Sequence, residues 1–487
     1  MNRIKVLLLA LLVASFSLAA CSGPKTVCTV NCGGGGNASL NVTLAAVPFT
    51  PPPNSSILSF AVTITGISLT PTSGASDVNI PLNATTYVVD LTRLQSDSAF
   101  LGQLLASVPA AAYNKLTVAV AGAVVTYCTD TAGTPGCASG SVAQIIKAAA
   151  APATSSFSLT LSSSQQAAIQ IQFNFANAIS VTASTQVVSG VDLTAANVLT
   201  ASTLPPTASS LATGQVDFVE DVTGVVTAAS ATSVTVQTST HGSITAAANS
   251  SSLAMSNCVT TNAACPPAVG QVASIDTALN SDGTFTLLEF DPIAPTSSDW
   301  IEGVVTSTPL SSTQFQIVTN DIFLASAGTL IGANLSVGAP VQVTLNNVAP
   351  FLVDTKGLTV PTSFAGSQDA TVIVPGQAVA LHVKSFTAAN GTVLAAATVD
   401  TVVLRFTRVA GSVFTAAPPI FNIQSLPPFF GPTVTYEVQL NSGSPSTNYD
   451  GIANASGLTA GQNVSIRALY FGPTVVPAFS AAKVRKQ

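Results

Sequence analysis

The amino-acid sequence predicts a mainly β protein, in which a β-sandwich domain is followed by three small β-barrel or β-sandwich-like modules. Of its 487 residues, 47% are hydrophobic and only 7% are charged, whereas soluble domains usually have about a quarter charged. Disordered chains show the opposite pattern, since they are charged and poor in aliphatic residues. The abundant Val and Thr favour strands, and short alternating segments between turn residues are typical of sandwiches and barrels.

Residues 1–20 have the pattern of a signal peptide. Arg3 and Lys5 supply positive charge, and the apolar run 6–18 is too short for a stable membrane span. The run leads into Leu18-Ala19-Ala20-Cys21, which resembles the lipobox of bacterial lipoproteins. That resemblance implies that the thiol of Cys21 is lipidated and that Cys21 becomes the new N-terminus. An ordinary signal peptidase site with Cys21 merely nearby is the alternative.

The lipobox resemblance implies an envelope protein whose partner is the membrane, reached through its lipid anchor. Residues 21–36 end in four glycines and are predicted to form a flexible tether. Ser22 follows the cysteine, which resembles the outer-membrane default of Gram-negative sorting and leaves the leaflet open. Beyond residue 20 the chain has 12 basic and 20 acidic residues, a net charge of −8. It therefore has no basic patch, and nucleic acid is not an expected partner.

Six cysteines remain besides Cys21, and they fall into three close pairs. Exported proteins meet an oxidising compartment, so local disulfides are the natural interpretation. The first pair lies in the tether. The chain has two histidines and no Cys-X-X-Cys, so we predict no metal site and no cofactor. The pairs are Cys28 with Cys32, Cys128 with Cys137, and Cys258 with Cys265.

Residues 37–204 are predicted to form the sandwich domain, because short strands alternate there with turn residues. The segment 94–105 carries Leu94, Leu101, Leu104 and Leu105 at helical spacing and is predicted to be a short helix. The predicted strands are 40–44, 60–67, 87–91, 113–120, 157–161, 169–175 and 179–181.

Four segments of this domain resemble an uncharacterised family of domains that follow the lipobox in many bacterial lipoproteins. They are the opening strand and the sequences VTITGISLTP (62–71), VVDLTRL (88–94) and LLASVPAAAYNKLTVAV (104–120). Members of that family often carry Asp-Ala-Pro after the first strand and Pro-Ala-Gly-Tyr before the late one. Here those segments read Ala46-Val47-Pro48 and Ala110-Ala111-Ala112-Tyr113, so the Asp and the Gly are missing.

A Pro/Ser/Thr-rich linker, 205–216, precedes an internal repeat. Each copy has one glycine in an opening strand and a second before Gln, and the two glycines are 46, 73 and 50 residues apart. The pattern resembles a small, uncharacterised β-barrel-like repeat family of bacterial envelope proteins. We expect three modules, 217–296, 297–408 with an insertion, and 409–487. Their glycine pairs are Gly224 and Gly270, Gly303 and Gly376, and Gly411 and Gly461.

The residues after each second glycine are predicted to form a strand with an apolar inner face, since side chains alternate along a strand. Val379, Leu381 and Val383 share that face in the second module, and Val464 and Ile466 share it in the third. The equivalent outward position is Asp276, His382 or Arg467 in the three copies. An acid, an imidazole and a base cannot share one chemical role, so we predict solvent-facing residues there. We therefore interpret His382 and Lys384 as facing solvent, and His241 likewise because its context is turn-like.

No catalytic constellation is predicted. Ser480-Ala481-Ala482-Lys483 matches the S-x-x-K pattern of serine acyl-enzymes, but it lies in a predicted strand instead of a helix. Acidic residues cluster at the module borders, where they are either calcium ligands or, more simply, solvated linker charges. These residues are Asp217, Glu220, Asp221, Glu289, Asp291, Asp299 and Glu302.

The leading functional hypothesis is a non-enzymatic envelope lipoprotein that acts as a modular binding or structural protein. The alternative is a carbohydrate-binding or adhesin lipoprotein, because aromatic residues crowd the last third of the chain and could stack on sugar rings. An envelope protein or polysaccharide partner therefore stays open. The aromatic residues are Trp300 at the start of the second module and, in the last third, Phe421, Phe429, Phe430, Tyr436, Tyr449, Tyr470 and Phe471.

Overall fold

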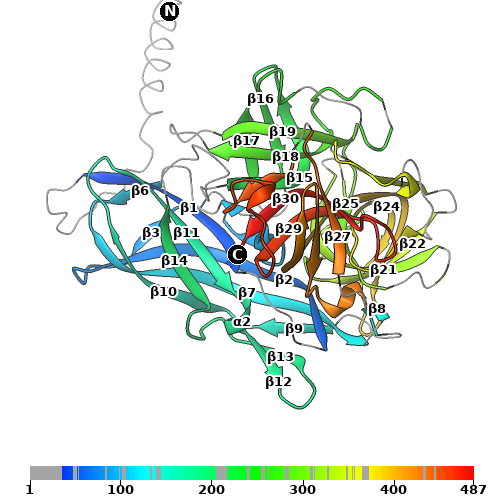
Figure 1. Ribbon diagram of the computed structural model, residues 1–487. Coiled ribbons are helices and arrows are strands. Elements are labelled where there is room, and N and C mark those ends of the chain that lie inside the picture. The colour runs from blue at the N-terminus through cyan, green and yellow to red at the C-terminus, as the bar shows by residue number, and fades with distance from the viewer. Residues whose placement is uncertain are drawn as a thin grey trace, which may run out of the picture.

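Figure 1 shows the computed structural model, with the sandwich strands on one side and the green, yellow and orange-to-red barrel strands on the other. No helix among its described residues is long and apolar enough to cross a membrane. Cys21, Cys28, Cys32 and His241 lie outside those residues. The structure describes residues 36–47, 52, 54–82, 85–97, 99–100, 106–131, 134–138, 144–204, 217–238, 242–253, 258–261, 263–279, 285–307, 311, 313–325, 328–346, 349–353, 355, 357–364, 372–431, 435–443 and 446–487.

Two β-sheets face each other in the sandwich. One contains β14, β11 and β1, with β1 and β11 parallel, and the other has the order β10-β7-β2-β3. Their inner faces share one apolar core, which includes Leu40, Phe60, Val118 and Ile169. Its elements are β1 (Asn37–Val47), β2 (Ser55–Pro71), β3 (Val78–Ile80), β4 (Tyr87–Asp90), the 3-10 turn η1 (Arg93–Gln95), β5 (Ala99–Phe100), β6 (Ala106–Pro109), β7 (Ala112–Thr131), β8 (Thr134–Cys137), β9 (Gln144–Ala148), β10 (Ala151–Thr160), β11 (Gln166–Asn174), the short helix α2 (Phe175–Ala178), β12 (Ile179–Thr182), β13 (Val187–Val191) and β14 (Leu199–Leu204).

The predicted helix over 94–105 is wrong where the structure describes it. Only the turn η1 is helical, and Leu94 is its one buried residue. Ala99 and Phe100 instead pair with β1, and residues from Ala106 onward pair with the beginning of the same strand. The ladder on β1 satisfies the backbone of these residues, so tertiary pairing overrides the local helical spacing.

Three closed β-barrels follow in the described part of the chain. In each, five strands pair in the ring order first, second, third, fifth, fourth and back to the first, and the third and fifth are parallel. This is a five-stranded Greek-key barrel, an architecture that OB-folds share. The prediction of a mainly β fold with several β-modules is therefore confirmed.

The barrels are joined directly. The first half of the long strand β25 closes barrel 2 by pairing with β24, and its second half opens barrel 3 by pairing with β29. Barrel 1 has β15 (Asp217–Ala229), β16 (Ser233–Gln237), β17 (Ser243–Ala247), β18 (Val272–Leu279) and β19 (Phe285–Ala294). Barrel 2 has β20 (Trp300–Val305), β21 (Gln314–Phe323), β22 (Pro340–Leu345), β23 (Phe351–Val353), η3 (Thr362–Phe364), β24 (Ala378–Thr387) and β25 (Ala395–Ala417). Barrel 3 shares β25 and adds β26 (Ile420–Gln424), η5 (Pro428–Phe430), β27 (Thr435–Leu440), β28 (Asn448–Asp450), η6 (Ala455–Gly457), β29 (Asn463–Tyr470) and β30 (Phe479–Lys486).

The first glycine of each repeat lies where two strands approach closely. A Cβ atom on Gly224, Gly303 or Gly411 would lie 2.4, 2.5 or 2.6 Å from a carbonyl oxygen of the neighbouring second strand. Real Cβ atoms do not come that near to another heavy atom. Every barrel therefore needs glycine at this position.

The second glycine and its glutamine form the turn into the fourth strand. Gly270, Gly376 and Gly461 all have φ between +81° and +93°, the left-handed region that favours glycine. The following glutamine side chain, through Oε1, accepts a hydrogen bond from the backbone N–H three residues earlier. The distances are 2.8 Å for Gln271, 2.9 Å for Gln377 and 3.2 Å for Gln462. One local mechanism thus explains the recurring Gly-Gln pair.

Candidate functional site at the junction of the sandwich and the barrels

The segment 90–97 of the sandwich, which follows β4, is the main polar contact with the barrels. Asp90 Oδ1 accepts hydrogen bonds from the backbone N–H groups of Phe60 and Thr92, each at 3.0 Å. Asp90 Oδ2 accepts one from Asn320 Nδ2 in β21, at 2.7 Å. One carboxylate therefore shapes the turn and attaches it to barrel 2.

Arg93 continues the contact with barrel 2. Its Nη1 lies 3.8 Å from Glu302 Oε2 and 3.7 Å from Asp321 Oδ2. Arg405 reaches the same glutamate, with Nε 4.0 Å from Oε1, and donates a 3.2 Å hydrogen bond to Thr223 Oγ1 of barrel 1. Glu302 and Arg405 are only 2% and 1% exposed. The sandwich, barrel 1 and barrel 2 therefore meet around one buried carboxylate.

Barrel 3 presents a row of cations to the sandwich. Arg408, Arg467 and Lys483 are direct cross-strand neighbours on β25, β29 and β30. Asp97 accepts a hydrogen bond from Arg408 Nε through its carboxylate and another from Arg485 Nη1 through its backbone carbonyl, at 2.9 Å. Burial alone would raise the pKa of Asp97, but Arg408, Arg467 and Lys483 hold it below its usual value. The row of cations thus stabilises the charged carboxylate of Asp97.

Arg467 also connects barrel 3 to barrel 1. Its Nη2 lies 3.2 Å from Asp276 Oδ2, and its guanidinium lies over the ring of Phe406, 5.3 Å from the centroid. Arg467 is 5% exposed, so the prediction that it faces solvent is wrong. It does point out of its own barrel, but the outer faces of barrels 1 and 3 meet there.

His382 was also predicted to be solvated, and the structure corrects this in part. Val379, Leu381 and Val383 are buried and Lys384 is exposed, so the predicted register is right. The imidazole of His382 stacks on buried Trp300, with centroids 5.2 Å apart, and its Nδ1 lies 2.6 Å from Asp400 Oδ1. Its side chain is 23% exposed, because Trp300 and Asp400 of barrel 2 cover part of it.

Both cysteine pairs that the structure describes have their sulfur atoms at bonding distance, and in each pair the Cα atoms are 5.2 Å apart. Cys128 and Cys137 lie in β7 and β8 of the sandwich, yet their side chains belong to the apolar cluster of barrel 3. Cys258 and Cys265 lie in the connection between β17 and β18 of barrel 1. The two pairs therefore occupy different settings.

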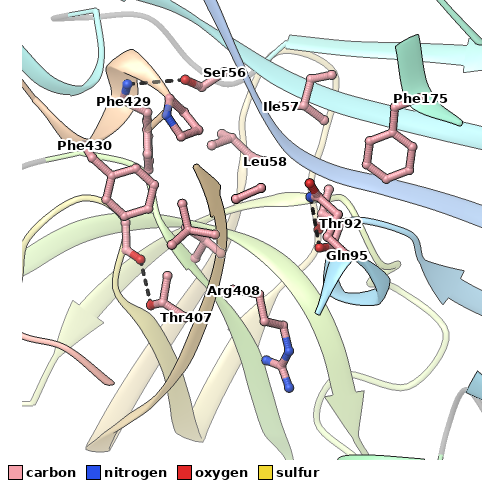
Figure 2. A pocket seen from close by; sticks show the side chains of 15 residues that line it. Ser56, Ile57, Leu58, Thr92, Gln95, Phe175, Thr407, Arg408, Phe429 and Phe430 are labelled. Carbon is pink, nitrogen blue, oxygen red and sulfur yellow. Dashed lines mark hydrogen bonds between the residues drawn. The ribbon is translucent and has the colours of Figure 1, made fainter. Parts of the chain in front are cut away.

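A cavity of about 90 Å³ lies beside this junction. Figure 2 shows Ser56, Ile57 and Leu58 of the sandwich on one side of it and Phe429 and Phe430 of barrel 3 on another. A second, 30 Å³ cavity extends the same seam past Arg93 and Glu302. Ligand pockets usually measure several hundred Å³, so these spaces are packing gaps between domains.

The acidic residues at the module borders do not assemble a cation site in the described part of the chain, where no three metal-ligating side chains converge. Asp299 accepts backbone hydrogen bonds from Ala325, Leu330 and Ile331 at 2.6–2.9 Å, and Glu302 faces arginines. The side chains of Asp217, Glu220 and Asp221 lie outside the described residues. The S-x-x-K match from Ser480 to Lys483 lies in β30, as expected, and both residues are buried.

The aromatic residues of the last third form core and interface contacts. Phe421, Phe429, Phe430, Tyr436, Tyr470 and Phe471 are each at most 5% exposed, and Trp300 is 1% exposed. Phe430, Tyr470 and Phe479 pack on one another with centroids 4.6–6.3 Å apart. The buried rings are unavailable for stacking on a sugar, whereas Tyr449 is half-buried. These residues therefore do not form an exposed aromatic row of the kind that would favour a sugar binder.

The sequence did not lead us to predict this junction. Every arginine beyond residue 20 lies in it: Arg93, Arg405, Arg408, Arg467 and Arg485. A useful signal was available, because in so uncharged a chain an arginine within an apolar strand has to find a buried carboxylate. Asp90 and Arg93 even lie inside the VVDLTRL segment.

The sandwich matches a known family model. Residues 38–203 match a family model described as "Domain of unknown function (DUF4382)". No curated protein matches the chain. A solved structure, a multidomain protein with nucleic acid binding domains from Streptococcus pneumoniae, is 9% identical with a TM-score of 0.10, over 55% of this chain and 72% of that one. A likeness that low carries no argument.

Proposed function

We propose that this protein is an exported, lipid-anchored envelope protein that presents its sandwich and barrels as one rigid, non-enzymatic binding or structural unit. The proposal rests on the junction, where cations and carboxylates from the sandwich and the three barrels contact one another in the interior. An active site instead places its ionisable groups where a substrate can reach them. Here Asp97, Glu302, Arg405 and Arg467 are at most 5% exposed.

The surface supports the same proposal. The outward residues of the second and third strands of barrels 1 and 2 are mainly uncharged, and they pair with each other across the strands. Thr235 and Thr245 lie 2.9 Å apart, and Gln316 Nε2 donates to Gln342 Oε1 at 3.2 Å. A surface of hydroxyl and amide groups suits contacts with other neutral polar surfaces of the envelope. An envelope location accords with the lipobox-like Leu18-Ala19-Ala20-Cys21.

The anchor is tested by replacing Cys21 with Ser in cells grown with labelled palmitate. We expect the Cys21→Ser variant to lose the label and leave the membrane fraction. Cys28→Ser is the matched control, because it removes a cysteine seven positions further on and leaves the lipobox-like residues intact. A Cys21→Ser protein that is still labelled and membrane-bound would refute the anchor.

The binding role is tested by cross-linking in intact envelopes followed by mass spectrometry of what the wild-type protein captures. The proposal predicts envelope proteins or polysaccharide held at equal yield by wild type and by a His382→Ala variant. A turnover activity that Asp299→Asn or His382→Ala abolishes in the folded protein would contradict a non-enzymatic role.

A further inference from the structure

A hairpin of the sandwich reaches past its own sheet into the barrels. The end of β7 and the short strand β8 pair through Asp130 and Cys137, and the disulfide between Cys128 and Cys137 closes the hairpin. We call the described residues of this hairpin, 128–131 and 134–137, the tongue. In Figure 1, β8 is drawn among the strands of barrels 2 and 3.

The tongue is fitted to barrel 2 by its backbone. The N–H of Cys137 donates a 2.8 Å hydrogen bond to the carbonyl of Thr306. Gly136 has φ +83°, and a Cβ there would lie 2.8 Å from both Thr306 O and Pro375 Cγ. Only glycine allows this approach, since the conformation and the space both exclude a side chain.

The tongue is fitted to barrel 3 by its side chains. Cys128 and Cys137 are 0% and 8% exposed and pack in the cluster that contains Phe429 and Phe430. Ser56, which is paired with Cys128 in the sheet, accepts a 3.3 Å hydrogen bond from the N–H of Phe429 through Oγ. The disulfide is therefore an apolar part of the interface as well as a link within the sandwich.

We propose that the Cys128–Cys137 disulfide is a redox latch that holds the tongue against barrels 2 and 3. The sandwich then docks fully on the barrels only after this bond has formed. The strand β8 has only four residues and few ladder contacts with β7. Without the disulfide, its backbone is therefore free to leave Thr306. Formation of the latch oxidises two thiols to one S–S bond and reduces the disulfide of an exchange partner to two thiols.

In an exported protein, this chemistry ties completion of the junction to the oxidising side of the membrane. That link rests on the proposed function, but the latch itself does not, because it is defined by contacts within one chain. Failure of the palmitate test would leave the latch intact, and failure of the latch would leave the anchor intact.

The second disulfide is a matched control for the first. Cys258 and Cys265 enclose a loop of similar size, and the hydrogen bonds described for them are internal to barrel 1. The N–H of Cys258 donates to Ala263 O at 2.9 Å, and Gln271 Nε2 lies 3.4 Å from Cys265 Sγ. Loss of this bond removes a disulfide without touching the tongue.

The test is hydrogen exchange of the full chain, followed by mass spectrometry of peptides that cover Thr306 and 427–431. In a variant with both Cys128→Ala and Cys137→Ala, we expect exchange in these peptides to accelerate at least about tenfold, with strands β29 and β30 unchanged. The control with both Cys258→Ala and Cys265→Ala should match wild type there. Equal exchange in all three proteins would overturn the latch.

A second arm guards against a variant that fails to fold. Folded wild-type protein is titrated with a phosphine reductant, and free thiols are counted alongside exchange. The latch predicts that peptides 427–431 lose protection as the thiols of Cys128 and Cys137 appear. Unchanged protection after both thiols are free would also overturn it.

Discussion

Asp276 of barrel 1 and Arg467 of barrel 3 occupy the same position of their repeats and form an ion pair, with Oδ2 and Nη2 3.2 Å apart. Each follows its Gly-Gln turn by the same number of residues, and each points away from its own barrel core. The two copies carry opposite charges at this position, and the charges are complementary because these two outer faces pack together. The acid and the base at this repeat position stabilise the packing of two barrels, and they do not form an active site that the copies share.

Replacing Asp276 with Ala should lower the free energy of unfolding by roughly 3–5 kcal/mol, because it leaves the buried guanidinium of Arg467 without this carboxylate. Lys384→Ala is the control, since the Lys384 side chain is 53% exposed and surface changes cost under about 0.5 kcal/mol. Urea unfolding of the full chain measures both. Equal effects of the two substitutions would mean that the pair contributes nothing.

Asp97→Asn should destabilise the protein at neutral pH and have a smaller effect in acid. The neighbouring cations hold the folded pKa of Asp97 below its unfolded value. The stabilisation is therefore fully present above the unfolded pKa, about 4, and is lost as pH falls through the folded pKa. Urea midpoints of both proteins between pH 3 and pH 7 should converge at the acidic end. A constant difference across that range would contradict this electrostatic role.

Asp130→Asn should show the opposite pH dependence. Burial raises the pKa of Asp130 to about 6, against a smaller opposing effect of the hydrogen bond from Ser56. The folded state thus favours the protonated carboxyl, so wild-type stability falls as pH rises from about 4 to about 6. Above pH 6 the Asn variant should be the more stable protein, by roughly 1 kcal/mol. An Asn variant less stable than wild type at pH 8 would show that the charge is stabilising.

Leu381→Ala should cost roughly 2–5 kcal/mol, because Leu381 is fully buried in the core of barrel 2. His382→Ala should cost less, about 1 kcal/mol, since it removes one stacking contact and one hydrogen bond from a partly exposed site. The intrinsic fluorescence of Trp300, the single tryptophan, reports on both during urea unfolding. If His382→Ala proves as costly as Leu381→Ala, the register of β24 has to be reassigned.

The parts of the fold that the sequence predicts are those governed by local rules. The alternation around Leu381 fixes the inner face of β24, because a shift by one residue would turn every apolar side chain outward. Proximity along the chain likewise brought Cys128 to Cys137. The left-handed turn at Gly376 and the close approach at Gly303 explain why those glycines recur.

The parts that escaped prediction depend on how the domains pack. Arg467 points outward by periodicity, and only the placement of barrel 1 makes that direction an interior one. The segment around Leu94 had helical spacing, but pairing of Ala99 with β1 decided its structure. Likewise, Asp97 and Arg408 are more than 300 residues apart, so no local pattern could have joined them.

The central claim, that the buried ion pairs fuse the sandwich and the barrels into one unit, is tested most directly by native-state hydrogen exchange of the full chain in low urea. We predict that the amides of β2 and β7 in the sandwich and of β29 and β30 in barrel 3 open with one common free energy. Asp97→Asn should lower that energy for all four strands together. Sandwich strands that keep their wild-type protection while β29 and β30 lose theirs, or the reverse, would contradict the claim.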